Sequence, residues 1–276
     1  MNDRISMGSV SEKLLNFIDT AQVHDSYYEI ALTLVKNYEK VKTMPIAEMA
    51  DLCYVSQATI SRFCRFLGYE NFKRFHDDMN LEFRLLDDYT GQFRSLLRSS
   101  DRKAAEMYQE RVRKNLETAL SEENFREIRR AADLIAAGKR TAFFSHHFLW
   151  DAGHYFQTKM IMMDRYIELY QSYDNQMKCA QSLDEDCTAI ICSAGGTYFS
   201  YYRDLTGTIL NSKAKVIVLT QNVNSNLING ADLVIRCGET NQDDTGKFAM
   251  LAVIDHLVLQ FMKRHYSIHK GENLND

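Results

Sequence analysis

Residues 46–67, which read IAEMADLCYVSQATISRFCRFL, constrain the fold of this chain more than any other stretch. Their order of small, apolar and polar residues suits two short helices that cross closely, as in a helix-turn-helix. Ala50 is small enough to let the second helix approach the first. Val55 then covers the crossing, and Ser56 can cap the second helix by accepting a backbone N–H at or next to Thr59.

The second helix of this motif has a buried face and a free face. Ile60 and Phe63 recur at helical spacing on the buried face, so the opposite face is free to enter the major groove of DNA. Gln and Arg side chains can pair with base edges, whereas Ser and Thr mostly fix phosphates. We expect DNA contacts from the following residues: Ser56, Gln57, Ala58, Thr59, Ser61, Arg62, Arg65, Lys73 and Arg74.

Positive charge gathers in this segment, although the chain as a whole has a formal net charge of −4. Between Ser56 and Arg74, Glu70 is the only acidic residue among several Arg and Lys residues. An alternative interpretation is a solvated face on a small helical bundle, because helix-turn-helix motifs also occur in proteins that never touch DNA. The capping residue, the paired core positions and the basic face together favour a double-stranded DNA operator as partner.

The segment resembles the N-terminal domain of RpiR-type transcriptional regulators, whose pattern runs V-S-x-A-T-[IV]-x-R-F-C-[RK]-x-L-G-[YF]-x-x-F. The matching residues are Val55, Ser56, Ala58, Thr59, Ile60, Arg62, Phe63, Cys64, Arg65, Leu67, Gly68, Tyr69 and Phe72. One departure is at the turn, where Tyr54 occupies a place usually given to Gly. We expect a slightly altered but intact turn, because Gly adopts the required conformation more readily than a bulky residue.

Length and composition indicate a cytoplasmic protein of two domains. The chain has 276 residues, of which 45% are hydrophobic, enough to bury a sizeable core. No apolar run approaches the roughly 18 residues of a membrane span, and the N-terminal MNDRISMGSVSEK lacks the apolar core of a signal peptide. Without such a run we expect no membrane partner. The six cysteines contain no CxxC pair, so we expect reduced, structural thiols.

Helical periodicity dominates the first part of the chain. The predicted helices are residues 11–19, 25–37, the two motif helices and 71–86. Pro45, the single proline, marks the start of the first motif helix. Basic and apolar residues then interleave, which indicates a helical connector. The predicted domains are a helix-turn-helix domain over 1–86, a helical linker over 87–120 and a sensor and oligomerisation domain over 121–276.

Short β-type runs alternate with helices after Glu122, a pattern typical of a parallel, doubly wound sheet. The expected strands are 140–145, 166–169, 188–192, 215–220 and 233–236. The predicted fold is therefore an all-α helix-turn-helix domain followed by an α/β domain with a doubly wound parallel sheet. Ligands bind such sheets beyond the carboxyl ends of the strands, which directs attention to the loops after Ser145, Cys192 and Thr220.

The loop CSAGGT at residues 192–197 follows a strand and opens a helix, so it is either a phosphate cradle or an ordinary glycine turn. This half resembles a sugar isomerase (SIS) domain, which RpiR-type regulators carry and which binds phosphosugars at an S-x-S-G-x-T loop. Residues 220–232 also resemble its T-x-x-x-x-S-x-L-x-x-x-A-D segment. The resemblance implies a phosphosugar effector. The implied ligand-binding residues are Ser145, His146, His147, Ser193, Gly195, Gly196, Thr197 and Thr220.

The departures from the SIS pattern put this pocket in question. The two family serines fall on Cys192 and Ala194, and the family pattern G-x-G-x-S falls on residues 145–149, which read SHHFL. A pair of imidazoles thus replaces a bare backbone loop. Two interpretations stay open: the pocket recognises a phosphosugar or a different anion, or the domain is only a dimerisation unit.

Histidines near this loop invite two further interpretations. His147 and His154 are seven residues apart and near Asp151, but no further Cys or carboxylate completes a metal site, so we expect no metal. A phosphosugar isomerase fused to a DNA-binding domain would need a base, for which His146, His147 and Glu239 qualify by residue type only.

We expect a regulator of carbohydrate metabolism genes, with no catalytic residues and no cofactor. One recognition helix covers only a half-site of DNA. We therefore expect a homodimer or homotetramer on a pseudo-palindromic operator, because closed symmetry supplies the second helix.

Overall fold

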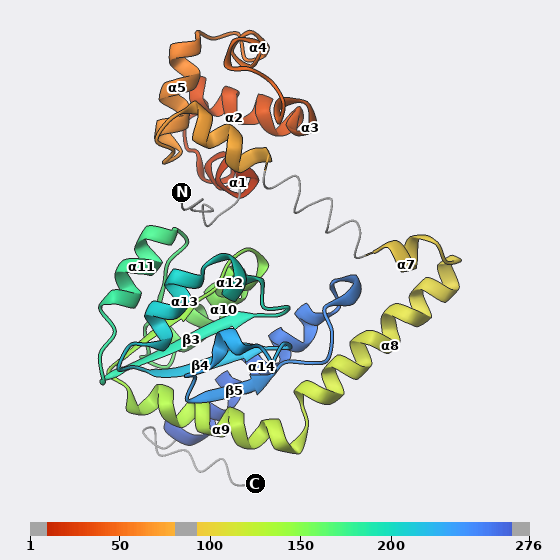
Figure 1. Ribbon diagram of the computed structural model, residues 1–276, viewed down its shortest axis with the longest axis vertical. Coiled ribbons are helices and arrows are strands. Elements are labelled where there is room, and N and C mark those ends of the chain that lie inside the picture. Colours follow the sequence, from red (N-terminus) through yellow and green to blue (C-terminus); the bar gives the residue numbers. More distant parts are fainter. Residues whose placement is uncertain (1–9, 81–92, 267–276) are drawn as a thin grey trace. The chain divides into compact units, whose positions relative to one another are not determined.

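The computed structural model describes residues 10–80 and 93–266 (Figure 1). The chain divides into two compact units, Met1–Gly91 and Gln92–Asp276. The end of the predicted helix 71–86 and the start of the predicted linker lie outside the described residues, over 81–92. Among the described residues, no helix is both long enough and apolar enough to cross a membrane.

The first unit is entirely helical in its described part. Its helices are α1 (Val10–Thr20), α2 (Ser26–Lys36), α3 (Tyr38–Val41), α4 (Ile46–Leu52), α5 (Gln57–Phe66) and a further helix over residues 72–80. The Asp25 carboxylate begins α2 by accepting the backbone N–H groups of Tyr27 and Tyr28, at 2.9 and 3.0 Å. Pro45 immediately precedes α4, as the sequence predicts.

The core of the first unit lies where the helices meet. Met49 and Ala50 of α4 are buried, and so are Ile60 and Phe63 of α5. These four side chains belong to one cluster with apolar residues of the other helices, among them Leu34 of α2. The apolar positions predicted for the motif therefore form the contact between its two helices.

The second unit is built on a five-stranded parallel sheet, which confirms the predicted fold class. Its strand order is β2-β1-β3-β4-β5. The strands are β1 (Arg140–Phe144), β2 (Ile167–Leu169), β3 (Cys187–Ser193), β4 (Lys215–Thr220) and β5 (Leu233–Arg236). The central strand β3 is buried along its whole length, as expected of a strand with helices on both faces.

Helices cover both faces of this sheet (Figure 1). The helices of the second unit are α7 (Arg94–Leu97), α8 (Asp101–Ala119), α9 (Glu122–Ala137), α10 (Phe148–Ile161), α11 (Tyr173–Gln181), α12 (Thr197–Tyr201), α13 (Arg203–Leu210) and α14 (Gly246–Phe261). Apolar side chains of α9, α10 and α14 form one cluster with Ile190 of β3 and Ile217 of β4. The helices α11, α12 and α13 lie on the opposite face.

Helix α8 is packed within the second unit, against the loop that precedes α14. The side chain of Asn115 is fully buried there; its Nδ2 donates to the Thr240 carbonyl at 2.8 Å, and its Oδ1 accepts the Glu239 N–H at 2.8 Å. Arg111 forms an ion pair with the buried Asp243. The described part of the predicted linker is thus fixed to this loop by buried polar contacts.

Candidate nucleic-acid interface and effector loops

The turn between α4 and α5 holds Tyr54 in the left-handed backbone region, with φ of 55°. The Tyr54 side chain is 96% exposed, so it avoids the crossing helices by lying in solvent. The Val55 N–H still donates to the Ala50 carbonyl at 3.0 Å and closes the turn. The expected intact turn is therefore present, at the energetic cost of a non-glycine residue in this conformation.

Polar side chains at the start of α5 form a chain of contacts. The Ser56 hydroxyl accepts the Thr59 N–H at 3.2 Å, which is the predicted cap. The Ser56 and Thr59 hydroxyl oxygens are 2.9 Å apart. The Arg62 guanidinium donates from Nη2 to Thr59 Oγ1 at 3.3 Å, so the first two turns of the helix share one polar ridge.

Within the first unit, the face of α5 opposite its buried side chains is open to solvent. Gln57, Ala58, Arg62 and Arg65 are exposed, as is Ser56, while Thr59 and Ser61 are partly exposed. Arg65 Nε donates to the Ser61 carbonyl at 3.4 Å, which keeps the guanidinium along the helix.

The two basic residues predicted after α5 lie on the helix over residues 72–80. Lys73 is exposed, and Arg74 is partly buried with Nη2 3.3 Å from Asp78 Oδ1. Burial raises the pKa of the Asp78 carboxyl, although the Arg74 charge opposes this shift. The Arg74 guanidinium is therefore already paired with a carboxylate of the first unit.

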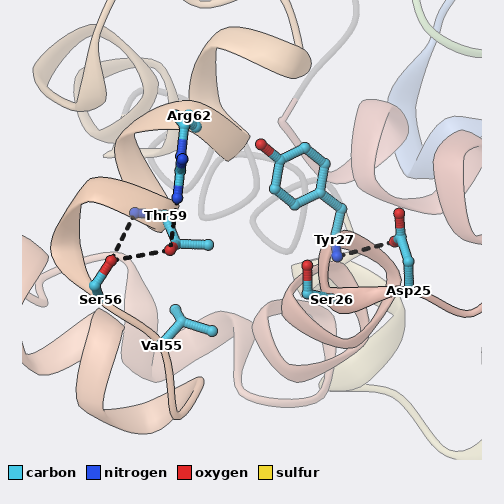
Figure 2. Close-up of a pocket in the computed structure, with 7 residues that line it drawn as sticks. All are labelled: Asp25, Ser26, Tyr27, Val55, Ser56, Thr59 and Arg62. Atoms are coloured by element: carbon cyan, nitrogen blue, oxygen red, sulfur yellow. Dashed lines mark hydrogen bonds between the residues drawn. The ribbon is translucent and has the colours of Figure 1, made fainter.

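A hollow lies beside this ridge, between the start of α2 and the start of α5 (Figure 2). Its lining residues are Asp25, Ser26, Tyr27, Val55, Ser56, Thr59 and Arg62. Figure 2 shows Tyr27 and Arg62 on opposite sides of the hollow, with the hydroxyls below them. The hydroxyls of Ser26, Tyr27, Ser56 and Thr59 that line the hollow can donate hydrogen bonds to an oxygen of a DNA phosphate.

In the second unit, the loop after β1 holds the buried side chain of His146. His146 is only 8% exposed, and its Nε2 lies 3.2 Å from Thr197 Oγ1 at the start of α12. The rings of Tyr198 and Tyr202 pack edge-on against it, each with centroids 5.6 Å away. Burial, and to a lesser extent the neighbouring His147, lowers the pKa of His146 to about 3, so this imidazole is neutral near pH 7.

Two buried polar atoms at this loop lack a hydrogen-bond partner among the described residues. They are Nδ1 of His146 and the Ser145 hydroxyl. His147 is exposed and has φ of 49° just before α10. Such backbone geometry is costly for a non-glycine residue.

The loops after β3 and β4 are tied to each other. The buried Ser193 hydroxyl accepts the Tyr198 N–H at 3.2 Å. The buried Thr220 hydroxyl donates to the Ala194 carbonyl at 3.2 Å. Gly196 is in the left-handed region with φ of 89°. The exposed parts of this loop are Gly195 and Thr197, which leaves only part of the predicted ligand set open to solvent.

The remaining candidates of the second unit, His154 and Glu239, contact neighbouring side chains. In the described part of the chain, no group of three or more His, Cys, Asp or Glu side chains is placed to hold a metal ion. His154 stacks on Trp150, and its Nδ1 is 3.2 Å from Gln157 Oε1. Glu239 accepts a hydrogen bond from Thr118 of α8 at 3.1 Å.

Residues 13–84 match the model of the helix-turn-helix domain of the rpiR family. The first unit contains an rpiR-family helix-turn-helix domain. This match confirms the resemblance that the motif residues indicate, and it includes every predicted DNA-contacting residue. The chain matches no curated protein.

Solved structures resemble this chain at low identity. NanR of Vibrio vulnificus, complexed with ManNAc-6P, is 15% identical with a TM-score of 0.50, over 95% of this chain and 95% of that chain. The sugar isomerase domain of an RpiR transcription factor from Sphaerobacter thermophilus is 15% identical with a TM-score of 0.48, over 57% of this chain and 86% of that chain. The NanR likeness shows a shared fold.

The rpiR-family domain also contains site residues that sequence reasoning missed. Asp25, Ser26 and Tyr27 line the hollow beside Arg62, although some 30 residues of chain separate them from α5. The aspartate before a helical pattern is a visible capping signal. The approach of two helix starts is a tertiary contact, which periodicity does not reveal.

Proposed function

We propose that this protein is a DNA-binding transcriptional regulator of carbohydrate-related genes, acting in the cytoplasm. The observation that carries the proposal is the exposed face of α5, with Gln57, Arg62 and Arg65, in an rpiR-family helix-turn-helix domain. Such a helix enters the major groove, where Gln and Arg side chains pair with adenine and guanine edges.

The hollow next to α5 supports separate sites for phosphate contacts and base contacts on DNA. Ser26, Tyr27 and the Ser56–Thr59 pair surround a space next to the Arg62 guanidinium. Phosphate contacts at this position would fix the register of α5, while exposed Gln57 and Arg62 reach base edges. Lys73 and Arg74, on the next helix, add positive charge that acts on any sequence.

We further propose that the second unit senses a phosphosugar or a related anion and joins copies of the chain into a homodimer or homotetramer. Support comes from the loops that meet beyond the carboxyl ends of β1, β3 and β4, where such sheets bind ligands. NanR, which shares this fold, was solved with ManNAc-6P. A ligand that prefers one arrangement of the copies would change DNA affinity.

A second candidate is a second unit that only oligomerises. It is favoured by the Ser193 and Thr220 hydroxyls, which are buried and bonded to backbone groups, and by the imidazole of His146, which fills the first loop. An isomerase is supported less, since Glu239 is held by Thr118 of α8 and the neutral His146 is buried.

The experiment that tests DNA binding is selection of the full-length protein on a random duplex library, followed by titration of the recovered sequence. A regulator with two recognition helices should enrich an inverted repeat and bind it at least a hundred times more tightly than a scrambled duplex at physiological salt. Recovery of no common sequence, with binding that depends only on salt, would contradict the proposal.

A further inference from the structure

Helix α10 presents apolar side chains to solvent on the face that points away from the sheet. Met162, at its C-terminal end, is 74% exposed, and Phe148, at its start, is 44% exposed. Tyr155 lies between them and is also exposed. Folded monomers rarely leave a row of large apolar side chains uncovered, so this face is suited to a protein contact.

The exposed face of α10 reads alike in both directions from Tyr155. Phe148 is seven residues before Tyr155, and Met162 is seven after it. Asp151 is four residues before Tyr155, and Lys159 is four after it. All five positions are exposed. An apolar residue thus has an apolar counterpart at equal spacing, and an acidic residue has a basic one.

Contacts within the protomer fix the centre of this face. The Tyr155 hydroxyl donates to Asp255 Oδ1 of the neighbouring helix α14 at 2.7 Å. The Lys159 ammonium lies 5.3 Å from the centroid of the Tyr155 ring. Helix α14 extends the apolar surface with Leu259 and, directly after its end, Met262, which are both exposed.

We propose that this face, defined by Phe148, Asp151, Tyr155, Lys159 and Met162, is where a second copy of the chain docks. The two α10 helices pack antiparallel about a twofold axis that passes near Tyr155. In a twofold contact, residue i of one copy meets residue j of the other, and residue j meets residue i. The mirrored spacing then places Asp151 of each copy against Lys159 of the other, and Phe148 against Met162.

Charge complementarity selects the antiparallel orientation of the second copy. A helix in the same orientation would place like residues together, Asp151 near Asp151 and Lys159 near Lys159, which is repulsive. The antiparallel arrangement turns both pairs into attractions. The inference deepens the proposed function, because it assigns the surface that brings two recognition helices to one operator.

The test is a charge exchange read out by sedimentation of the full-length protein without DNA. Asp151→Lys and Lys159→Asp each set like charges against each other twice across the twofold, so each should weaken the dimer at least ten-fold. The exchanged variant D151K/K159D should recover dimerisation. Met162→Glu, which sets a charge against Phe148, should also dissociate the dimer and has no compensating change. Thermal melting confirms that each variant is folded.

The matched controls are Asp174→Lys and Lys178→Asp, which reverse exposed charges on α11, on the other face of the sheet. They should sediment as wild type does. Dimers of D151K and K159D that are as stable as these controls, an exchanged variant that stays monomeric, or a wild type that is monomeric would each overturn the inference. Binding of the same variants to a half-operator is measured separately. Failure of the wild type to bind the half-operator would instead contradict the proposed DNA function.

Discussion

The Ser56 and Thr59 hydroxyl oxygens lie 2.9 Å apart at the start of α5. Because Thr59 Oγ1 also accepts a hydrogen bond from Arg62, the guanidinium is held beside the hollow before DNA binds. Less side-chain entropy then has to be lost on binding, which favours affinity.

Replacing Arg62 with alanine should weaken binding to the selected operator by about 1 to 3 kcal/mol and relax preference at the base pair that Arg62 contacts. Arg74→Ala should instead weaken binding to operator and scrambled duplexes alike, by a smaller factor, because Arg74 is engaged with Asp78. Fluorescence anisotropy on both duplexes measures the two effects. Arg126→Ala, an exposed arginine on α9, is the control. Unchanged operator affinity in Arg62→Ala would refute the base contact.

Replacing Tyr54 with glycine should stabilise the first unit by roughly 1 kcal/mol. The left-handed conformation at φ of 55° strains any residue with a Cβ atom, and the exposed ring contributes little packing. Tyr54→Ala is the matched variant, because it removes the ring but keeps the Cβ atom. Urea unfolding followed by circular dichroism compares the three proteins. A gain in the alanine variant equal to that of the glycine variant would show that the ring, not the backbone, causes the strain.

Replacing Asn115 with alanine should lower the free energy of unfolding of the second unit by about 2 to 4 kcal/mol. The substitution leaves the N–H groups of Glu239 and Thr240 without the carbonyl oxygen that now accepts both, at 2.8 and 3.0 Å. Gln109→Ala, on the exposed side of the same helix, should change stability by less than about 0.5 kcal/mol. Chemical denaturation gives both values, and a similar small effect at both positions would contradict the role of Asn115.

The neutral His146 should make stability depend on pH. Its pKa of about 3 in the folded protein lies below the unfolded value near 6.5, so the unfolded chain binds more protons between these limits. Stability from this group is complete above about pH 6.5 and falls as the pH decreases, by at most about 1.4 kcal/mol per pH unit. His146→Phe should have a flatter profile from pH 6.5 to 5, whereas His154→Gln should follow the wild type. Parallel slopes in all three would contradict the buried neutral imidazole.

Replacing Thr197 with valine should reduce the thermal shift produced by any phosphorylated sugar that binds. Thr197 is exposed at the start of α12, and its hydroxyl oxygen lies 3.2 Å from His146 Nε2. A ligand at a hundred times its dissociation constant stabilises the folded state by about 2.7 kcal/mol. Differential scanning fluorimetry with a panel of sugar and amino-sugar phosphates reads this shift, with Thr208→Val on α13 as control. A full shift in Thr197→Val would place the effector elsewhere.

Local patterns were sufficient for the strands and for the two motif helices. The strand predicted at 215–220 coincides with β4, and the one predicted at 233–236 coincides with β5, because buried parallel strands are continuous apolar runs. The motif helices were also predictable, since Ser56 and Pro45 mark their starts. The predicted 166–169 strand begins one residue later, at Ile167.

The contacts between distant segments were not predictable from these patterns. The hollow joins Tyr27 to Arg62, and the buried amide of Asn115 joins α8 to Glu239. Neither pair has a periodicity or a motif, because each depends on how whole elements pack. The burial of His146 among tyrosine rings is of the same kind.

The buried amide of Asn115 has a mechanical consequence. The carbonyl of Thr240 accepts Nδ2 of Asn115 at 2.8 Å and Nε2 of Gln221, the residue that follows β4, at 3.1 Å. One oxygen atom therefore joins the carboxyl end of β4 to α8. From Asn115 to Asp101 the helix extends about 21 Å at 1.5 Å per residue. A shift beside β4 would carry this length of α8 with it, because Arg111, one turn closer to Asp101, is also paired with Asp243 of the same loop.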